Sequence, residues 1–482
     1  MRRPTLLSGL DLLAPKLPGD ASLLALPPPV RPLPNPEAAV RAAIDHPVAG
    51  RPLAERVTAR SKVLIVVEHP AHLVPAGELR PLRLALHAVL DVLKARGLPL
   101  RAVKILVACG LEHRPAMTEL APALGLEVTG GYEVDIFDAE AHRAFRDQPD
   151  GANGAQELAQ ALAEADLIVD LSVRTHAPRP PLANLVEGLA TYRALRPLHR
   201  PEQNPEPIAL QRAKALAAEL PIFSVALVQS EAVLSAAAQG LLGTSDGLSA
   251  SARAWNRMPQ LMRRRAAALF RSAAAPGAVF AGDPLAAESQ ADDAVRAATR
   301  VPHGPPVDIL VIGVPDLSPD APDARPNPVL TAHLGLVTLL GQVRHRLRDG
   351  GAVVLATPLG DQFNRVQHLP YVEFYERALR VAPRGIDLSQ RFEFDFSGRP
   401  ELVAAYQKRG AVHGAHPFHR WYAQERARAG LRVFAAGAGA AAAQRVGFEP
   451  AATVEAGLEQ ARDVLGLAQP QVGVLDVLGL AR

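Results

Sequence analysis

The sequence predicts an α/β protein of two domains, each a mostly parallel sheet flanked by helices, with a cleft between the domains. Three observations favour this class. The 482 residues exceed what one hydrophobic core usually serves. A hydrophobic content of 48% with 21% charged residues is typical of a soluble folded protein. Short β-branched runs also alternate along the chain with segments of helical periodicity, as in parallel sheets with crossover helices.

The first half begins with proline clusters over residues 17–54, which predict an extended strap followed by a short helix. Four predominantly apolar runs follow, at residues 62–69, 104–110, 166–173 and 222–228. Runs of this kind, without alternation, are typical of strands buried on both faces. Helical patterns at 78–96 and 156–165 separate the runs and complete βαβ units.

The alternation stops over residues 229–275, where alanine-rich and arginine-rich helical patterns stand, and it resumes near residue 307. The arginine triplet at 263–265 is read as a solvated helix face. Three more strands are expected in the second half, at 307–315, 350–358 and 432–438, with helices at 327–346, 371–380 and 453–466. We place the domain boundary near residue 290, giving domains 1–290 and 291–482.

Composition excludes several classes of protein. The 52 basic and 49 acidic residues nearly balance, and no basic run is long enough to follow a phosphate backbone, so no nucleic-acid partner is expected. No run of eighteen apolar residues predicts a membrane span. The single cysteine, Cys109, excludes an internal disulfide. Pro4, Asp11 and Pro15 interrupt any apolar signal segment, so the expected location is the cytoplasm.

Titratable residues follow the predicted strands, at the edge where open α/β sheets bind ligands. His113 and Arg114 come directly after the second strand. An imidazole titrates near neutrality, so His113 is a candidate general acid/base, and Arg114 is a candidate clamp for a carboxylate or phosphate. The alternative interpretation is an ordinary histidine at a strand end.

Two further strand ends carry histidines. The first strand ends in Glu68, His69 and His72, and the third is followed by Arg174 and His176. Metal binding by His69 and His72 is an alternative, although two histidines without a third ligand are weak support for it. A metal-dependent enzyme that uses His113 as well is a further alternative.

The segment "AVHGAHPFHRWYA" contains His413, His416 and His419. We expect it to form a helix or strap in the second domain, because Phe418 and Trp421 supply much apolar area close together. A structural role for its histidines is preferred over a place in the cleft.

Several stretches resemble a known family. "ACGLEHRPAMTE" is similar to a segment of the nickel-pincer-nucleotide lactate racemase family, and "DLIVDLSV…EGLATYRALRPLHRP" is similar to another. In the second half, "NPVLTAHLGL", "RDGGAVVLATPLGDQFNRVQHLPYVEFYERAL" and "AYQKRGAVHGAHPFHRWYA" also resemble the longer members of that family. The resemblance spans roughly residues 35 to 470.

The resemblance implies a reaction in which a nickel-pincer nucleotide, tethered to a lysine, removes a hydride from a 2-hydroxy acid and returns it to either face. It places His113 and His176 as catalytic acid/base residues and His199 as a metal ligand. Arg114, His69 and His72 would bind the substrate, the two histidines standing where the family has an aspartate and an arginine.

The chain departs from the family where the cofactor is attached. Ala183 occupies the position of the tethering lysine, and Pro180 and Pro181 replace the glycine pair before it. No lysine occurs between Lys104 and Lys214, and proline lacks the backbone N–H that a phosphate-bearing cofactor would use.

Three functions follow. The first is a racemase or epimerase of a small 2-hydroxy acid. The second is a catalytically degenerate relative that binds a small anion, metabolite or partner without turnover. The third is a different metal-dependent enzyme. The substrate, the oligomeric state and the cofactor content are left open by the sequence.

Overall fold

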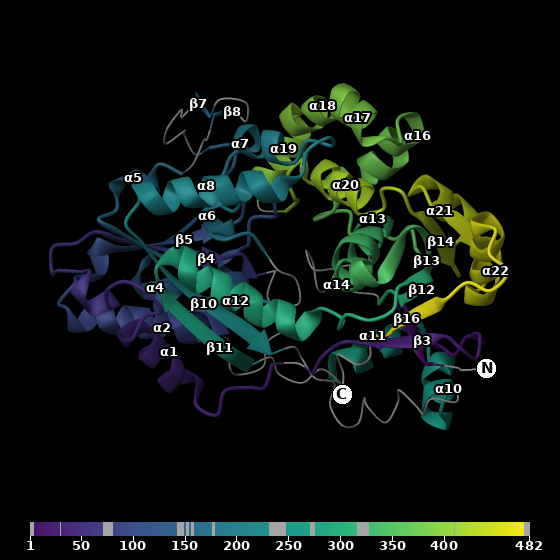
Figure 1. Cartoon of the computed structure of the whole chain (residues 1–482). Helices are drawn as coiled ribbons and strands as arrows, with labels where there is room; N and C mark the ends of the chain where they lie inside the picture. Colours follow the sequence, from purple (N-terminus) through teal and green to yellow (C-terminus); the bar gives the residue numbers. More distant parts are fainter. Residues whose placement is uncertain are drawn as a thin grey trace.

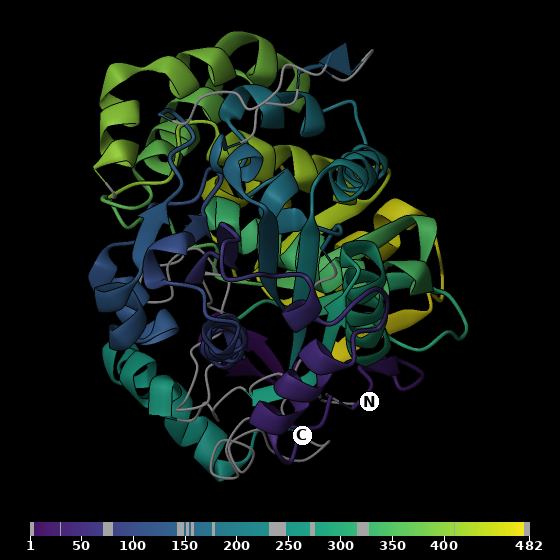
Figure 2. The same cartoon turned by 90° about the vertical axis from the view of Figure 1, so that its left-hand side faces the viewer.

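The computed structural model describes residues 4–28, 30–70, 81–141, 149–150, 154–155, 159–175, 179–230, 247–269, 275–315, 327–408 and 410–476. These residues form two six-stranded sheets, and each is flanked by helices. Figure 1 shows the two sheets in separate halves of the molecule, and Figure 2, seen from the side of the first sheet, shows the blue-to-teal elements in front. The predicted α/β architecture with two mainly parallel sheets is therefore confirmed.

The first sheet has the order β11-β10-β9-β4-β5-β6. Its strands are β4 (Val63–Glu68), β5 (Val103–Ala108), β6 (Glu133–Ile136), β9 (Leu167–Arg174), β10 (Ile222–Ser230) and β11 (Ala275–Gly282). All neighbours are parallel except β11, which runs antiparallel to β10. β4 and β9 are buried at every position, including the polar residues Asp170, Ser172 and Arg174 of β9, as expected of strands covered on both faces.

Helices cover both faces of the first sheet. On one face, α1 (Pro36–Asp45) and α2 (Pro81–Ala95) pack against the odd-numbered residues of β4. On the other, α6 (Ala183–Val186), α7 (Tyr192–Leu198) and α8 (Pro205–Glu219) pack against the even-numbered ones, and α12 (Pro284–Thr299) packs on β10 and β11. Local sequence fixes where α1 begins, because the Asn35 side chain accepts a hydrogen bond from the Ala38 amide and Pro36 occupies the first turn.

The second sheet has the order β15-β14-β13-β12-β16-β3 and is parallel throughout. Its strands are β3 (Ser22–Ala25), β12 (Val307–Gly313), β13 (Leu347–Ala356), β14 (Arg432–Ala436), β15 (Glu449–Ala451) and β16 (Val472–Asp476). One face is covered by a large helical layer that includes α13 (Pro328–His333) and α20 (His416–Ala427), and the other by α22 (Val454–Leu465).

Shorter elements complete the described chain: β1 (Leu6–Ser8), β2 (Asp11–Leu13), β7 (Pro149–Asp150), β8 (Gly154–Ala155), α3 (Met117–Leu124), α4 (Leu126–Gly131), α5 (Ala161–Glu164), α10 (Ala250–Arg257), α11 (Gln260–Leu269), α14 (Leu340–Val343), α15 (Leu369–Glu373), α16 (Leu379–Val381), α17 (Gly385–Leu388), α18 (Phe394–Gly398), α19 (Pro400–Gln407), α21 (Ala440–Arg445), η1 (Leu53–Glu55), η3 (Leu100–Ala102), η4 (Leu334–Leu339), η5 (Arg344–Arg346), η6 (Phe374–Ala378) and η7 (Ser389–Glu393). None of the helices in the described ranges combines the length and the hydropathy that crossing a bilayer requires.

The division near residue 290, into 1–290 and 291–482, stays a proposal. The positions of β3 and α12 are relevant to where this boundary lies. β3, close to the N-terminus, pairs with β16 in the second sheet, as the purple and yellow strands of Figure 1 show. Residue 290 lies within α12, which packs on β10 and β11 of the first sheet. By these contacts the strand at 22–25 groups with the second half, and α12 groups with the first.

Candidate functional site

The site is built at the carboxyl edge of the first sheet, where parallel strands β5, β4 and β9 end side by side. Helix α20 of the second half meets this edge. Eight histidines from both halves gather here, which we call the histidine junction: His69, His113, His199, His333, His368, His413, His416 and His419. Seven of the eight are buried, and His199 is partly buried.

His69 and His113 form the first-half part of the junction. Nε2 of His69 donates a hydrogen bond to the main-chain carbonyl of His113 at 2.7 Å, and the two rings meet edge to face with centroids 4.9 Å apart. Burial, with the nearby His113 adding to it, lowers the pKa of His69 to about 4, so its imidazole is neutral at pH 7. Nδ1 of His113 is buried and has no hydrogen-bond partner among the described residues.

Glu112 joins this part to the second half. Its Oε1 accepts hydrogen bonds from Nε2 of His416 at 3.0 Å and from the Arg420 guanidinium at 2.7 Å. Nε2 of His416 carries the hydrogen that it donates to this carboxylate. Nδ1 of the same ring therefore accepts the hydrogen bond of the Tyr371 hydroxyl, which lies 2.9 Å away. The hydrogen bonds of Glu112 to His416 and Arg420 therefore hold α20 against the loop after β5.

Two neutral histidines complete the second-half wall. Burial lowers the pKa of His333 to about 3, and the nearby Arg420 adds to the shift. Burial likewise lowers the pKa of His368 to about 4, with a further contribution from His416. Nδ1 of His368 lies 3.3 Å from the Asn327 side-chain amide, whereas its buried Nε2 has no hydrogen-bond partner in the described chain.

His199 lies at the end of α7 and stacks on His419, with ring centroids 4.6 Å apart. Burial holds the pKa of His199 well below its usual value, and the approach of His419 lowers it further. His419 in turn lies 3.5 Å from Glu393. Burial opposes ionisation of Glu393, but the nearby His419 and hydrogen bonds from Ser389 and Tyr422 outweigh it and lower the pKa of this carboxyl.

Arg114 was predicted to bind a substrate carboxylate, but its guanidinium makes hydrogen bonds within the protein. Its guanidinium donates to the main-chain carbonyls of Phe137 at 3.2 Å and Gln407 at 2.9 Å, and it lies 3.2 Å from Asp138. The Gln407 contact makes Arg114 another link between the halves. We therefore transfer no ligand role to it.

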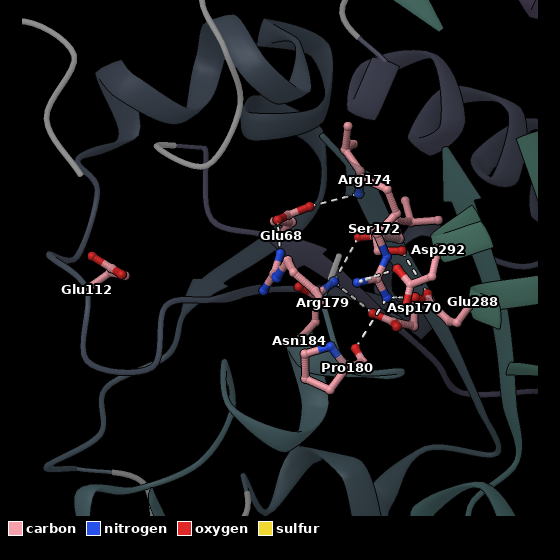
Figure 3. Close-up of polar contacts among 12 residues, drawn as sticks. Glu68, Glu112, Asp170, Ser172, Arg174, Arg179, Pro180, Asn184, Glu288 and Asp292 are labelled. Carbon is pink, nitrogen blue, oxygen red and sulfur yellow. Dashed lines mark hydrogen bonds and ion pairs between the residues drawn. The ribbon is translucent and has the colours of Figure 1, made fainter. Parts of the chain in front are cut away.

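A buried layer of ion pairs lies beside the junction, between β9 and α12 (Figure 3). The Arg174 guanidinium is 1% exposed and pairs with Glu288, and its NH1 lies 3.6 Å from Asp292. Ser172 donates to Glu288 at 2.7 Å. Separating these partners would leave buried charges unpaired, which is costly. The network therefore holds the end of β9 against α12, the helix that leads into the second half.

Glu68 and Arg179 form the second pair of that layer. Arg179 NH1 bonds Oε1 of Glu68, whose Oε2 accepts the Val173 amide at 2.8 Å. Deeper in the layer, Asn184 donates to Asp170 at 3.0 Å. Burial nevertheless raises the pKa of Asp170 to about 6.

Ala183 is the first residue of α6 and is 3% exposed. Helix α6 ends beside β5, because the Gly110 amide donates to the Gly188 carbonyl at 2.7 Å. Gly188 permits this approach, since a Cβ there would lie 2.7 Å from that of Ala108. Helix α6, which corresponds to the segment where the family carries its tethering lysine, thus lies beside the end of β5. The chain continues from that strand end to His113.

Not every predicted site residue can be placed. His72 and His176 lie outside the described residues. Within the described ranges, no three His, Cys, Asp or Glu side chains come together so as to hold a metal ion. A metal role for His199, and one shared by His69 and His113 with His72, therefore stay predictions from the sequence.

The histidines of the second half were read from the sequence as structural. The segment does form helix α20, and Phe418 and Trp421 pack in the second core as expected. His416, however, lies at the contact between the halves. A helix can present aromatic residues to one neighbour and histidines to another, so apolar content alone does not predict where its histidines point.

The sequence interpretation also missed the ion-pair layer. Glu288 and Asp292 stand four residues apart on α12, and both are buried. Acidic residues at this spacing share a helix face. The spacing of Glu288 and Asp292, together with the arginines near the end of the third predicted strand, could have predicted a buried ion-pair network.

Comparison with known proteins agrees with this architecture. Residues 15–177 match the family model described as the lactate racemase N-terminal domain. No curated protein sequence matches the chain. The structure of the lactate racemase apoprotein from Thermoanaerobacterium thermosaccharolyticum is similar with a TM-score of 0.63 and 16% identity, over 98% of each chain. A protein from Thermotoga maritima is more distant, with a TM-score of 0.45, 12% identity and coverage of 91% of this chain and 95% of that one. Residues 15–177 are therefore similar to the lactate racemase N-terminal domain, and the chain as a whole shares the fold of that apoprotein.

Proposed function

We propose that this chain is a lactate racemase-like protein that binds a small 2-hydroxy acid, or a similar small carboxylate, at the histidine junction without lysine-tethered cofactor chemistry. The observation that carries the proposal is Ala183. The position of the tethering lysine holds a methyl group that is 3% exposed. A methyl group offers no amine to attach a cofactor.

The residues around Ala183 do not fit a nickel-pincer nucleotide either. The Pro180 carbonyl accepts from Arg174, and neither Pro180 nor Pro181 has an amide hydrogen for a phosphate. Lys62 and Lys104 stand at the beginnings of β4 and β5, at the opposite edge of the sheet. No catalytic step through the cofactor is therefore derived for this chain.

Support for ligand binding comes from the unused polar atoms of the junction. Nδ1 of His113 and Nε2 of His368 are buried without hydrogen-bond partners among the described residues, and they come from opposite halves. Buried polar atoms are nearly always hydrogen-bonded, so atoms of this kind favour a polar ligand or bound water. A neutral imidazole either donates to a carboxylate or accepts from a hydroxyl, and a 2-hydroxy acid offers both groups.

Racemisation or epimerisation of a 2-hydroxy acid is the second candidate. It is favoured by the similarity of the whole chain to a lactate racemase apoprotein and by the placement of His113 at the carboxyl edge of the sheet. It requires a hydride acceptor held by some means other than an amine at position 183.

Calorimetric titration of the purified chain with D-lactate, L-lactate, pyruvate and acetate tests the proposal, and a racemisation assay on the same preparation separates the two candidates. We expect binding of lactate and no interconversion of its enantiomers. Binding of none of the four would contradict the proposal, and interconversion would establish the second candidate.

A further inference from the structure

Three arginines lie near the carboxyl edge of the first sheet, and their environments differ. Arg114 is taken up by main-chain carbonyls and Asp138. Arg174 is 1% exposed and lies between Glu288 and Asp292. The side chain of Arg179 is 25% exposed, so among these three it presents the most guanidinium surface to an arriving ligand.

Glu68 holds Arg179 in place. The Glu68 side chain is 2% exposed, and its two oxygens are divided between the Val173 amide and the Arg179 guanidinium. The backbone amide of Arg179 also bonds the Asp292 carboxylate, which fixes the start of the loop that leads to α6. Arg179 is thus anchored at both main chain and side chain, and Figure 3 shows it between Glu68 and the Asp292 group.

The Glu68 carboxylate is chemically equivalent to the carboxylate of a 2-hydroxy acid. A guanidinium binds either in the same planar, charge-assisted way. Glu68 therefore acts as an internal counter-ion on one edge of the Arg179 guanidinium. It competes with any external carboxylate for the positive charge and the N–H groups of Arg179.

The pair is linked to the junction through the chain and through Glu187. Glu68 is followed directly by His69, whose Nε2 contacts the carbonyl of His113. Glu187, near which both Arg179 and Arg420 lie, connects the same region to α20.

We propose that Arg179 is the carboxylate anchor of this protein and that Glu68 sets its affinity by competing with the ligand. This inference rests on the proposed function and adds the residue that recognises the acid. It replaces Arg114, the residue indicated by the sequence, with one that the structure leaves accessible.

The experiment measures the affinity of L-lactate and acetate for the wild type, Arg179→Gln, Glu68→Gln and the double variant by calorimetry. Arg179→Gln removes a charge-assisted contact and should weaken binding about tenfold to a hundredfold. Glu68→Gln should tighten binding, because the carbonyl of the substituted side chain can still accept the Val173 amide while its NH2 group no longer competes for Arg179. The double variant should bind as weakly as Arg179→Gln alone.

Arg200→Gln is the matched control, since Arg200 is an exposed arginine after α7. Its affinity should equal that of the wild type. Arg179→Lys keeps a positive charge without the planar fork and should bind at an intermediate strength.

The outcomes separate this inference from the proposed function. If the wild type binds lactate and His113→Ala weakens it, whereas Arg179→Gln and Glu68→Gln change nothing, the anchor is elsewhere and the proposed function stands. If neither the wild type nor Glu68→Gln binds any carboxylate, both fail together. Tighter binding by Glu68→Gln, lost again on Arg179→Gln, establishes the competition.

Discussion

Nε2 of His416 donates to Oε1 of Glu112 over 3.0 Å, and the two residues come from opposite halves of the chain. The bond is buried, and Arg420 shares the same carboxylate oxygen. The contact between the halves at this point is therefore polar and directional.

Acid should weaken the fold through three histidines of the junction. His69 and His368 have pKa values lowered to about 4, and that of His333 is lowered to about 3. An unfolded histidine titrates near 6.5, so between pH 6.5 and about 4 the unfolded chain binds more protons than the native one, and stability falls as pH falls. Each group contributes at most about 1.4 kcal/mol per pH unit.

The raised pKa of Asp170, about 6, acts in the opposite direction, because its protonation below pH 6 favours the native state. Burial also raises the pKa values of Glu187, Asp292 and Glu425, which act in the same direction as Asp170. The pKa values of His199, His345 and His419 are lowered as well, so in the described chain six histidines oppose these four carboxyls and should outweigh them. Urea unfolding at pH 7, 6 and 5 measures the net effect, and we expect a steady decrease in the free energy of unfolding. A free energy that is constant or rises toward pH 5 would show that the junction histidines are not held neutral.

Breaking the buried ion-pair layer should be costly. Glu288→Ala leaves Arg174 with Asp292 as its remaining carboxylate partner in the described chain, at 3.6 Å. Removal of one partner of a buried pair costs about 3–5 kcal/mol. Chemical unfolding of Glu288→Ala, Arg174→Met and the double variant measures this cost.

The double variant should be more stable than the sum of the two single losses implies, because neither Arg174 nor Glu288 is then left buried without the other. Asp293→Ala is the control, since Asp293 is the exposed neighbour of Asp292 on the same helix. Additive losses in the double variant would mean that Arg174 and Glu288 do not act as a pair.

His113→Ala should weaken lactate binding by about tenfold, the effect of removing one hydrogen bond to a charged group. The His113 side chain is only 5% exposed. Loss of a buried ring should therefore lower the free energy of unfolding by about 1–3 kcal/mol. His46→Ala, at an exposed histidine after α1, should change neither quantity. Wild-type affinity in His113→Ala would remove His113 from the site.

Strands β4, β5, β9 and β10 of the first sheet and β12, β13 and β14 of the second could be predicted from the sequence, because each contains a predominantly apolar segment that needs no context to recognise. β3 and β16 were not predicted. β3 is four residues long and exposed at three of its positions, so its membership in a sheet depends on β16, near the other end of the chain. Strand pairing between distant segments leaves no local signal.

The site divides in the same way. His69 and His113 could be located because they closely follow buried strands, and the carboxyl ends of parallel strands meet at one edge. The role of His368 could not be predicted, because its place depends on how the two halves pack. Arg114 shows the converse, since its position was predicted but its acceptors are carbonyls from residues 137 and 407.

Ala183→Lys should fold less stably than the wild type. Ala183 is buried in α6, which packs against α8, β4 and β9, so a lysine must either displace neighbours or bury its amine, and overpacking of this kind costs about 1–3 kcal/mol. Thermal unfolding of Ala183→Lys and of Ala183→Ser gives the comparison, because serine adds a single atom. Equal stability of the lysine variant and the wild type would show that position 183 opens onto free space.

Intact-mass spectrometry combined with nickel analysis tests the central claim most directly. The chain is produced together with the enzymes that make the nickel-pincer nucleotide, and a lysine-bearing lactate racemase produced in the same way serves as the positive control. Our account predicts the unmodified mass of 51.2 kDa, less than stoichiometric nickel and calorimetric binding of lactate by this same preparation. A covalent adduct with one nickel per chain and racemisation of lactate would contradict it.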